Sequence, residues 1–416
     1  MKLDTLLEYL AASHRFRRMA IFALSGALCL ASCGSAQPAS QASASSTTST
    51  ATEAPTTSSG ESTRAANASS LTGVVRQGFD GSTVWRLTQS AVRISTNGGL
   101  SWTSTPLPQG ALFNEVSDVV ATSSGVWLAK LESRSGTGAV IYHRASPNST
   151  WSNFTLSPTW SQIEARAGAP RAQILTGGGN IGVRLDRGGA QVGVSSILFI
   201  YNGTSFVERT LPTSALDFSG GTVLLLGNGK IVAQAARTGH LYYSTTGGRT
   251  WTESKINTSG IPVGSIGAPV ATSGGTIYLP VDLPKTSGTV FSPGSSDIAL
   301  YRSTDAGKSY QLVNSSIAPA LYSGAAWVLG ANGANVWVAP FDSGMLYEST
   351  NGGRKFKSII PSSPWYDPGK IMLLSSRVAL ALGAISSCVS FKADCTQHPF
   401  LLKTTDGGQD WETIPN

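Results

Sequence analysis

Charged side chains are scarce in this sequence. Only 13% of its 416 residues are Asp, Glu, Lys or Arg, against roughly 25% in a typical soluble domain. The formal net charge is +7, and it is +5 without the first 32 residues, which hold four basic and two acidic side chains. After residue 32 the sequence contains no run of basic residues and no basic stripe with interleaved aromatics. This weak positive charge argues against a nucleic-acid partner.

Metal and cofactor motifs are also missing. The four histidines lie far apart, and the cysteine pair in CVSFKADC (388–395) has no second ligand pair nearby, although a structural zinc site needs four such ligands. The glycine-rich stretch TGGGNIG (176–182) lies between two expected strands and does not open a helix. It is therefore interpreted as a turn and not as a phosphate loop. We expect neither a metal nor a cofactor.

Helical periodicity is absent after residue 70, where no apolar stripe with a 3.6-residue period extends over ten residues. Short β-branched and aromatic runs alternate instead with Gly, Asn, Asp and Ser, as in GTVLLLGNGKIVAQAARTGHLYYSTTGGRTW (221–251). This alternation is typical of short strands joined by tight turns. The sequence therefore predicts an all-β domain over residues 71–416.

The N-terminal segment HRFRRMAIFALSGALCLASC (14–33) places three arginines before a largely apolar run of 13 residues, Met19 to Ala31. Such a run is too short to span a bilayer comfortably, but its length is typical of a signal-peptide core. The ending LASC (30–33) resembles the lipobox of bacterial lipoproteins. That resemblance implies a signal peptide over residues 1–32 and lipid attachment at Cys33. The alternative is an ordinary secretory signal with a chance cysteine.

Residues 33–70 follow the expected cleavage point. From Gly34 to Ser70 this Ser-, Thr- and Ala-rich stretch has no aromatic residue and no apolar period, so it cannot bury enough surface to fold. We interpret it as a disordered tether behind the lipid anchor. The chain is then expected to be exported and anchored to a bacterial cell membrane, with its domain facing the outside or the periplasm.

Two cysteines remain in the expected domain, Cys388 and Cys395. In an oxidising compartment such a local pair is expected to form a disulfide. Closing this short loop would stabilise the fold by roughly 2–3 kcal/mol on the chain-entropy estimate. The alternative is a pair of reduced thiols.

One turn sequence recurs along the domain. Five clear copies begin at Ser95, Ser244, Ser303, Ser349 and Thr404; each continues with Gly-Gly or Ala-Gly and has an aromatic residue seven positions after its start. Weaker copies occupy residues 141–151 and 198–206, and the seven copies are 43 to 59 residues apart. Units of about 50 residues, each with four short strands, cannot bury both faces alone. The spacing therefore predicts a seven-bladed β-propeller of four-stranded antiparallel blades.

The turn resembles the Asp-box, or bacterial neuraminidase repeat, with the pattern Ser-x-Asp-x-Gly-x-Thr-Trp. This repeat occurs in sialidases, xyloglucan-cleaving hydrolases, sortilin-type receptors and the photosystem II assembly-factor family. The resemblance implies that each turn joins the third and fourth strands of a blade and that its aromatic residue packs between blades. We therefore assign a structural role to the turn residues Ser95, Asn97, Trp102, Ser244, Trp251, Ser303, Asp305, Tyr310, Ser349, Asn351, Phe356, Thr404, Asp406 and Trp411.

The turn carboxylate is not expected to be catalytic. The aspartate position holds Asp305 and Asp406 in two copies but Asn97, Thr246 and Asn351 in three others. A catalytic carboxylate would not tolerate this variation, whereas a group that caps a turn through hydrogen bonds would.

Candidate ligand-binding residues lie instead in the long segments between the expected strands, on the face opposite the turns. These segments are residues 158–171, 186–196, 281–297, 361–370 and 385–399, and long loops on a rigid scaffold often carry function. The candidates are Trp160, Arg166, Arg171, Asp282, Asp297, Trp365, Tyr366 and Asp367.

The function expected from these features is non-catalytic binding of a glycan or protein partner by a monomeric propeller. The Phe/Tyr-Arg-Ile/Leu-Pro segment typical of sialidases is missing, so no catalytic residue of that family can be assigned. The alternative is a sialidase-like or other glycoside hydrolase with an atypical site. Such an enzyme needs two carboxylates facing each other across a sugar, and Glu164, Asp282, Asp297 and Asp367 are the candidates.

Overall fold

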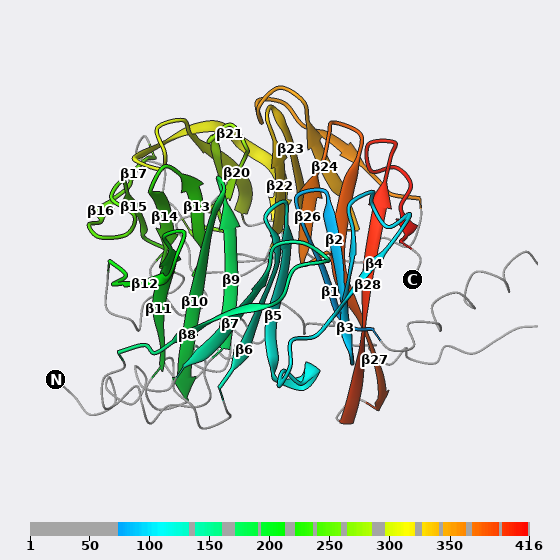
Figure 1. Cartoon of the computed structure of the whole chain (residues 1–416). Helices are drawn as coiled ribbons and strands as arrows, with labels where there is room; N and C mark the ends of the chain where they lie inside the picture. Colours follow the sequence, from blue (N-terminus) through cyan, green and yellow to red (C-terminus); the bar gives the residue numbers. More distant parts are fainter. Residues whose placement is uncertain are drawn as a thin grey trace, which may run out of the picture.

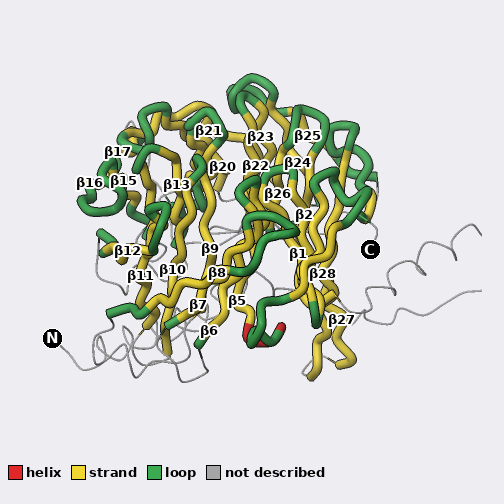
Figure 2. The backbone as a smooth tube through the Cα atoms, in the orientation of Figure 1, coloured by secondary structure: helices red, strands yellow, loops and turns green. Residues whose placement is uncertain are grey.

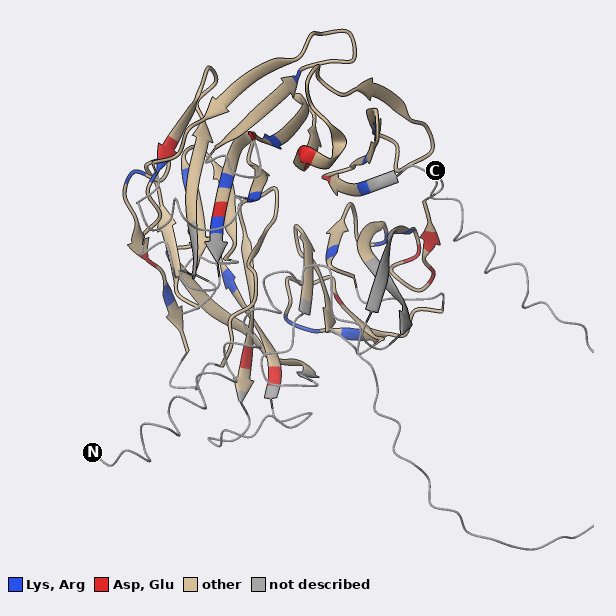
Figure 3. Ribbon diagram, turned by 90° about the horizontal axis from the view of Figure 1, so that it is seen from below, with Lys and Arg blue, Asp and Glu red and all other residues tan. Residues whose placement is uncertain are grey.

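The computed structural model describes most of the chain after residue 73. The described residues are 74–132, 138–159, 171–189, 193–212, 221–235, 239–258, 264–284, 296–320, 327–340, 344–362, 368–390 and 393–414. They form seven sheets arranged around a common axis, with one short 3₁₀ segment, η2 (Phe113–Glu115). Figures 1 and 2 show the sheets from the side, and Figure 3 looks along the axis. The predicted seven-bladed, all-β propeller is confirmed.

The blades follow the order of the chain. Blade I contains β1 (Val74–Asp80), β2 (Thr83–Thr88), β3 (Ala91–Ser95) and β4 (Thr103–Pro106). Blade II contains β5 (Val116–Thr122), β6 (Gly125–Leu131), β7 (Ala139–Arg144) and β8 (Ser152–Leu156). Blade III contains β9 (Arg171–Gly177), β10 (Asn180–Gly189), β11 (Gly193–Tyr201) and β12 (Phe206–Arg209). Blade IV contains β13 (Val223–Gly227), β14 (Lys230–Gln234), β15 (Leu241–Ser244) and β16 (Thr252–Glu253).

Blades V to VII complete the ring. Blade V contains β18 (Val270–Ala271), β19 (Ile277–Pro284), β20 (Ser296–Ser303) and β21 (Ser309–Ala320), with β17 (Lys255–Asn257) added at its outer edge. Blade VI contains β22 (Trp327–Asn332), β23 (Asn335–Pro340), β24 (Leu346–Ser349) and β25 (Lys357–Ile359). Blade VII contains β26 (Lys370–Leu373), β27 (Ala379–Ser390), β28 (Ala393–Thr404) and β29 (Glu412–Thr413).

Burial along each blade follows from this stacking. The second strands are buried almost continuously, as in β2, where Val84, Trp85, Arg86 and Leu87 are buried in a row. Both faces of such a strand are covered by neighbouring blades, so its sequence does not alternate between apolar and polar residues. The outer strands are mostly exposed, as β4 is. The apolar core therefore lies between the blades.

Three segments that the sequence analysis treated as long loops are partly strand, so that expectation was wrong. Residues 186–196, 281–297 and 385–399 include the ends of β10, β19 and β27 and the starts of their partner strands. Alternating polar residues kept these hairpin arms from standing out in the sequence. The longest hairpin, β27–β28, sets Cys388 opposite Cys395 in the strand register.

The ring closes between blades VII and I through side chains, because each described blade takes its four core strands from one contiguous segment. Phe79 and Val84 of blade I pack against Leu380, Leu401 and Ile414 of blade VII. The guanidinium of Arg86 donates a hydrogen bond to the Ile414 carbonyl at 2.8 Å. This closing junction therefore contains no strand pairing among the described residues.

Blades IV and V are joined differently. After β16 the chain runs along the outer edge of the next blade, where β17 pairs in parallel with β21. The pairing sets Lys255 against Ser309 and Asn257 against Gln311, and the Asn257 side-chain amide donates to Gln311 Oε1 at 3.0 Å. The outer edge of blade V thus accepts a further extended segment.

Five turns between third and fourth strands share one hydrogen-bond pattern, and we call them the glycine-pair turns (residues 95–102, 244–251, 303–310, 349–356 and 404–411). In blade VI, Ser349 Oγ accepts the Gly353 N–H at 2.9 Å and donates to Asn351 Oδ1 at 3.0 Å. Asn351 Oδ1 in turn accepts the Lys355 N–H at 3.0 Å. The short polar side chains therefore close the turn from inside.

The second glycine of each pair lies against the preceding blade. The two central residues have positive φ, which glycine adopts without cost, except that Ala306 replaces the first glycine in blade V with a φ of 62°. A Cβ built on the second glycine would lie 2.0 Å from Ile414 at Gly99, 2.4 Å from Val232 at Gly307, 2.2 Å from Leu300 at Gly353, 2.5 Å from Leu346 at Gly408 and 3.3 Å from Arg209 at Gly248. Each glycine-pair turn therefore presses its backbone onto the blade before it.

Blades II and III have no glycine pair in this turn. At the junction between them, side chains of β6, β7 and β8 meet those of β11 and β12 in what we call the aromatic cluster: Trp127, His143, Phe154, Tyr201 and Phe206. The His143 ring stacks on Trp127 with centroids 3.9 Å apart. The Tyr201 ring lies edge-on to Trp127 at 5.2 Å. Aromatic packing replaces the backbone contact at this junction.

Candidate functional site

Five of the predicted ligand-binding residues, Trp160, Arg166, Trp365, Tyr366 and Asp367, lie outside the described residues, as do Glu164, Cys33 and the N-terminal segments 1–32 and 33–70. The other three are placed. Arg171 is the first residue of β9 and is exposed, whereas Asp282 is fully buried in β19 and Asp297 lies partly buried in β20. Only Arg171 is therefore presented to solvent in the way a ligand requires.

Asp282 and Asp297 do not form a carboxylate pair. They belong to neighbouring strands of blade V, where Asp282 is opposite Ile298 and Asp297 is opposite Leu283. Opposed residues share one face of a sheet and successive residues alternate between faces. The two carboxylates therefore point to opposite faces of the same blade and cannot flank one sugar.

The first strands of neighbouring blades lie next to each other around the axis, and polar side chains connect them. Lys370 Nζ on β26 donates to the Phe79 carbonyl of β1 at 3.0 Å. Arg76 Nη1 on β1 donates to the Val116 and Ser117 carbonyls of β5 at 2.9 and 2.6 Å. Each of these cations therefore bonds to the backbone of the next blade.

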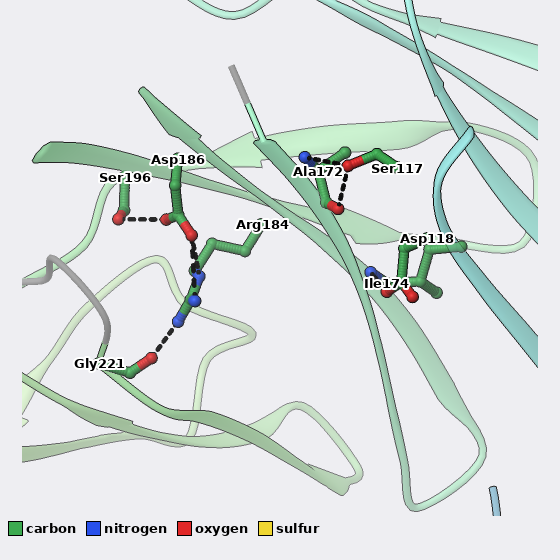
Figure 4. Close-up of polar contacts among 8 residues, drawn as sticks. All are labelled: Ser117, Asp118, Ala172, Ile174, Arg184, Asp186, Ser196 and Gly221. Atoms are coloured by element: carbon green, nitrogen blue, oxygen red, sulfur yellow. Dashed lines mark hydrogen bonds and ion pairs between the residues drawn. The ribbon is translucent and has the colours of Figure 1, made fainter. Parts of the chain in front are cut away.

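The connection continues from blade II to blade III (Figure 4). Asp118 Oδ2 accepts the Ile174 N–H of β9 at 2.7 Å, while Ser117 Oγ donates to the Ala172 carbonyl at 2.8 Å. The second oxygen of Asp118 accepts the Val119 N–H at 2.9 Å. One carboxylate and one hydroxyl thus hold two inner strands together.

We call Arg76, Asp118, Arg171 and Lys370 the channel group. All four stand within the first three residues of an inner strand: Arg76 in β1, Asp118 in β5, Arg171 in β9 and Lys370 in β26. First and third strands of a blade run in the same direction, so the starts of the inner strands lie on the face opposite the glycine-pair turns. Figure 3 views this face. The channel group therefore marks the mouth that faces away from the turns.

The electrostatics of the channel group reflect its enclosure by protein. Burial raises the pKa of Asp118 to about 6, although backbone hydrogen bonds and the nearby charges of Lys370 and Arg76 oppose the rise. Lys370 keeps an exposed surface, yet the surrounding protein lowers the pKa of its ammonium, and the carboxylates of Asp80 and Asp118 counter this in part. The cations and the carboxylate therefore influence each other without a direct ion pair.

A second polar group, on β10 and β11, links blades III and IV (Figure 4). Arg184 forms an ion pair with Asp186 at 3.0 Å and donates to the Gly221 carbonyl, and Ser196 Oγ donates to Asp186 Oδ1 at 2.5 Å. The register places Asp186 opposite Arg171. Because Arg184 and Asp186 are already paired with each other, this group serves blade packing and leaves Arg171 exposed.

The sequence analysis missed Arg76, Asp118 and Lys370. They stand on inner strands of three different blades, up to 294 positions apart in the sequence, and no local pattern connects them. The only sequence feature that could have indicated them is weak: each is a charged residue within a short run of strand-forming residues. Among the described residues, no group of three or more His, Cys, Asp or Glu could hold a metal ion, and no helix is long and apolar enough to cross a membrane.

Comparisons with known proteins show the fold alone. No protein-family model matches the sequence, and no curated protein is similar to it in sequence. Among solved structures, YCF48 bound to D1 peptide is 16% identical, with a TM-score of 0.45 over 80% of this chain and 92% of that one. The GH74 xyloglucanase from Xanthomonas campestris is 14% identical, with a TM-score of 0.47 over 83% of this chain and 54% of that one.

A third structure, the GH93 α-L-arabinofuranosidase of Fusarium graminearum with arabinobiose, is 10% identical, with a TM-score of 0.42 over 71% of this chain and 94% of that one. The three structures thus include both a peptide complex and glycoside hydrolases. A function for this chain has to be argued from its own residues.

Proposed function

We propose that this chain is a binding protein whose channel mouth, opposite the glycine-pair turns, binds an acidic segment of a protein partner. The observation that carries the proposal is the gathering of three cations from three blades at this mouth. Arg171 is exposed and has no hydrogen bond or ion pair with any described residue. Arg76 uses only Nη1, and Lys370 uses one of its three protons. Carboxylates of a partner satisfy such unused donors through charge-assisted hydrogen bonds.

A protein segment fits this mouth better than a neutral glycan does, because an uncharged sugar leaves the cations without counter-charges. Hydrolysis is not favoured by the described residues, since Asp282 and Asp297 face away from each other. Asp118 stands among the cations, but its two oxygens already accept backbone N–H groups. It is better suited to holding blades II and III together than to proton transfer.

The proposal is tested with a fluorescent ten-residue peptide of alternating Glu and Ser, titrated with the purified protein and followed by anisotropy. Arg171→Ala should raise the Kd about tenfold or more, because hydrogen bonds between charged groups contribute roughly 1.5–3 kcal/mol. Raising the salt concentration should weaken binding further. The matched control is Arg249→Ala, which removes an exposed arginine from a glycine-pair turn on the other face and should leave the Kd unchanged.

Equal weakening by the two substitutions would mean that the peptide responds only to net charge and would contradict the proposed mouth. Binding of a neutral oligosaccharide, with no binding of the acidic peptide, would instead make the partner a glycan.

We further propose that the mature protein begins at a lipidated Cys33 and is held at a bacterial membrane through the tether of residues 33–70, as a monomer. The lipobox-like LASC sequence supports this. Intact-mass analysis should find a diacylglycerol adduct on the N-terminal cysteine, and Cys33→Ser should move the protein into the soluble fraction. An unmodified N-terminus at another residue would favour the ordinary secretory signal.

The proposed Cys388–Cys395 disulfide is supported by the register of β27 and β28, which sets the two residues directly opposite each other. Alkylation without reductant should leave both cysteines unmodified, and alkylation after reduction should label both. Labelling of both residues before reduction would show that the thiols are free.

A further inference from the structure

The junction between blades I and II contains a groove of about 210 Å³ on the face of the glycine-pair turns. Its walls come from the ends of β3 and β4 and from the turns of blade II, including Ser123, Gly125 and Ser146. It lies on the opposite face from the channel group. The groove is therefore separate from the proposed mouth.

The absence of a glycine pair from blade II explains why the groove is open. At five junctions the second glycine of a pair contacts the preceding blade, with a built Cβ only 2.0 to 3.3 Å from it. Blade II has Ser146 and Pro147 in this turn, which closes on itself instead. Arg144 donates to the carbonyls of both residues, and the Ser149 N–H donates to the Ser146 carbonyl at 3.1 Å. At the end of this turn Trp151 Nε1 donates to the Pro106 carbonyl of blade I at 3.1 Å, but no glycine backbone of the turn lies against blade I.

Four threonines of blade I line the groove: Thr83, Thr96, Thr103 and Thr105. In the register Thr103 is opposite Ile94 and Thr105 is opposite Val92, so both stand on the face that packs toward blade II. None of the four hydroxyls has a hydrogen-bond partner among the described residues. By contrast, the side chains under the glycines of blades I, V, VI and VII are apolar.

Between the hydroxyls the groove is apolar, with Ile94, Ala121 and Val126 in its lining. Arg144 is the single charged residue there, and its guanidinium already donates to two turn carbonyls and lies 5.9 Å from the Trp151 ring centroid. The volume of the groove is below the 300–1,000 Å³ of pockets for drug-sized ligands. A small, uncharged ligand with several hydroxyls and an apolar face matches this lining.

We infer that the groove between blades I and II binds one residue of a neutral sugar. Threonine hydroxyls both donate and accept hydrogen bonds, as sugar hydroxyls do, and the C–H face of a pyranose can lie on the partly exposed Ile94. Unpaired hydroxyls on the groove walls make these hydrogen bonds without breaking existing ones.

The test uses the purified mature chain and three probes: the methyl glycosides of glucose, galactose and N-acetylglucosamine, each titrated by protein-observed NMR. At least one should bind. The isosteric substitutions Thr83→Val and Thr103→Val should each raise its Kd about fivefold, the loss expected for one neutral hydrogen bond. Ala145→Trp, which adds bulk to an exposed position in the groove wall, should abolish binding without removing any hydroxyl.

Thr252→Val is the matched control. Thr252 follows Trp251 in blade IV as Thr103 follows Trp102 in blade I, and both are exposed on the outer strand. The blade after it carries a glycine-pair turn, in which a Cβ on Gly307 would lie 2.4 Å from Val232 of blade IV. This variant should bind like the unsubstituted protein, and all variants should keep their melting temperature within a few degrees.

Three outcomes would overturn the inference. None of the three probes binds, Thr252→Val weakens binding as much as Thr103→Val, or a probe still binds in Ala145→Trp. Because the groove and the channel group lie on opposite faces, Arg171→Ala should not affect sugar binding. The inference can therefore fail while the proposed acidic-peptide site stands, and the reverse also holds.

Discussion

The junctions around this ring differ in how neighbouring blades are held at the turn face. Five junctions use the backbone of a glycine pair, and at four of them a built Cβ would lie within 2.5 Å of the preceding blade. The junction between blades II and III uses the aromatic cluster, and the junction between blades I and II leaves a groove. The five glycine-pair junctions are therefore built alike. The two other junctions differ from them and from each other.

The largest effect is expected from the aromatic cluster. Trp127 is 2% exposed and touches the four other rings, so Trp127→Ala should lower the free energy of unfolding by about 3–5 kcal/mol. Trp251→Ala, at a half-buried turn tryptophan of blade IV, should cost clearly less because the Gly248 contact remains. Chemical denaturation measures both. Similar losses would show that aromatic packing matters equally at both kinds of junction.

A smaller effect should separate the two glycines of one pair. Gly407 and Gly408 have φ of 86° and 88°, so alanine is equally strained at both positions. A built Cβ lies 2.5 Å from Leu346 at Gly408 but 4.0 Å from the nearest atom, on Glu348, at Gly407. Gly408→Ala should therefore cost about 2 kcal/mol more than Gly407→Ala. Equal destabilisation in a denaturant titration would mean that the turn conformation, not contact with the preceding blade, is what glycine provides.

Removing a single turn hydroxyl should have a still smaller effect. Ser349→Ala deletes the acceptor of the Gly353 N–H and should destabilise the protein by about 1 kcal/mol. Ser146→Ala in the turn of blade II should change the stability little, because its hydroxyl has no partner among the described residues. If both variants unfold at the same denaturant concentration, the hydroxyl does not contribute to closing the turn.

A pH-dependent effect is expected on the inner side of the junction between blades II and III. Asp118 has its pKa raised from 3.8 to about 6 in the folded protein. The folded state therefore binds more protons than the unfolded state between these pH values, and this group's contribution to stability falls as the pH rises through that window. Asp118→Asn should remove this fall, as measured by unfolding at pH 4, 5, 6 and 7. An unchanged pH dependence would contradict the raised pKa.

Asp305 in the turn of blade V gives the opposite sign. Burial acts to raise its pKa, but hydrogen bonds from Ser309 and Ser303 outweigh burial and hold the pKa below its usual value. Its stabilising contribution is present above the unfolded pKa and is lost as the pH falls below about 4. Asp305→Asn should therefore lose stability at neutral pH and converge with the unsubstituted protein in acid.

The seven-bladed fold could be predicted because its signal is local. A serine, a glycine pair and an aromatic residue stand within eight positions, so each copy is recognisable without any knowledge of distant contacts. The added strand β17 was not predicted, because nothing in Lys255–Asn257 indicates a parallel partner some 54 residues later. Residue spacing therefore predicts the strands and turns within a blade, but it does not predict the contacts between blades.

The candidate site shows the same division. Arg171 was predicted from its position at the end of a long segment, and it is exposed at the channel mouth. Asp282 was selected by the same reasoning, yet it is fully buried, because the hairpin arms of blade V extend further than the sequence indicated. Arg76, Asp118 and Lys370 meet only after three blades have closed around the axis. No single segment of the sequence contains that information.

The added strand β17 also affects which junction between blades separates first when a pulling force is applied. A force separating blade IV from blade V has to shear the hydrogen bonds between β17 and β21. Across blades VII and I the described residues form no strand pairing; the junction consists of side-chain hydrogen bonds, such as those of Arg86 and Lys370, and of the packing of Gly99 against Ile414. When the protein is pulled between Val74 and Ile414, blades VII and I should therefore separate first, while blades IV and V remain joined through β17.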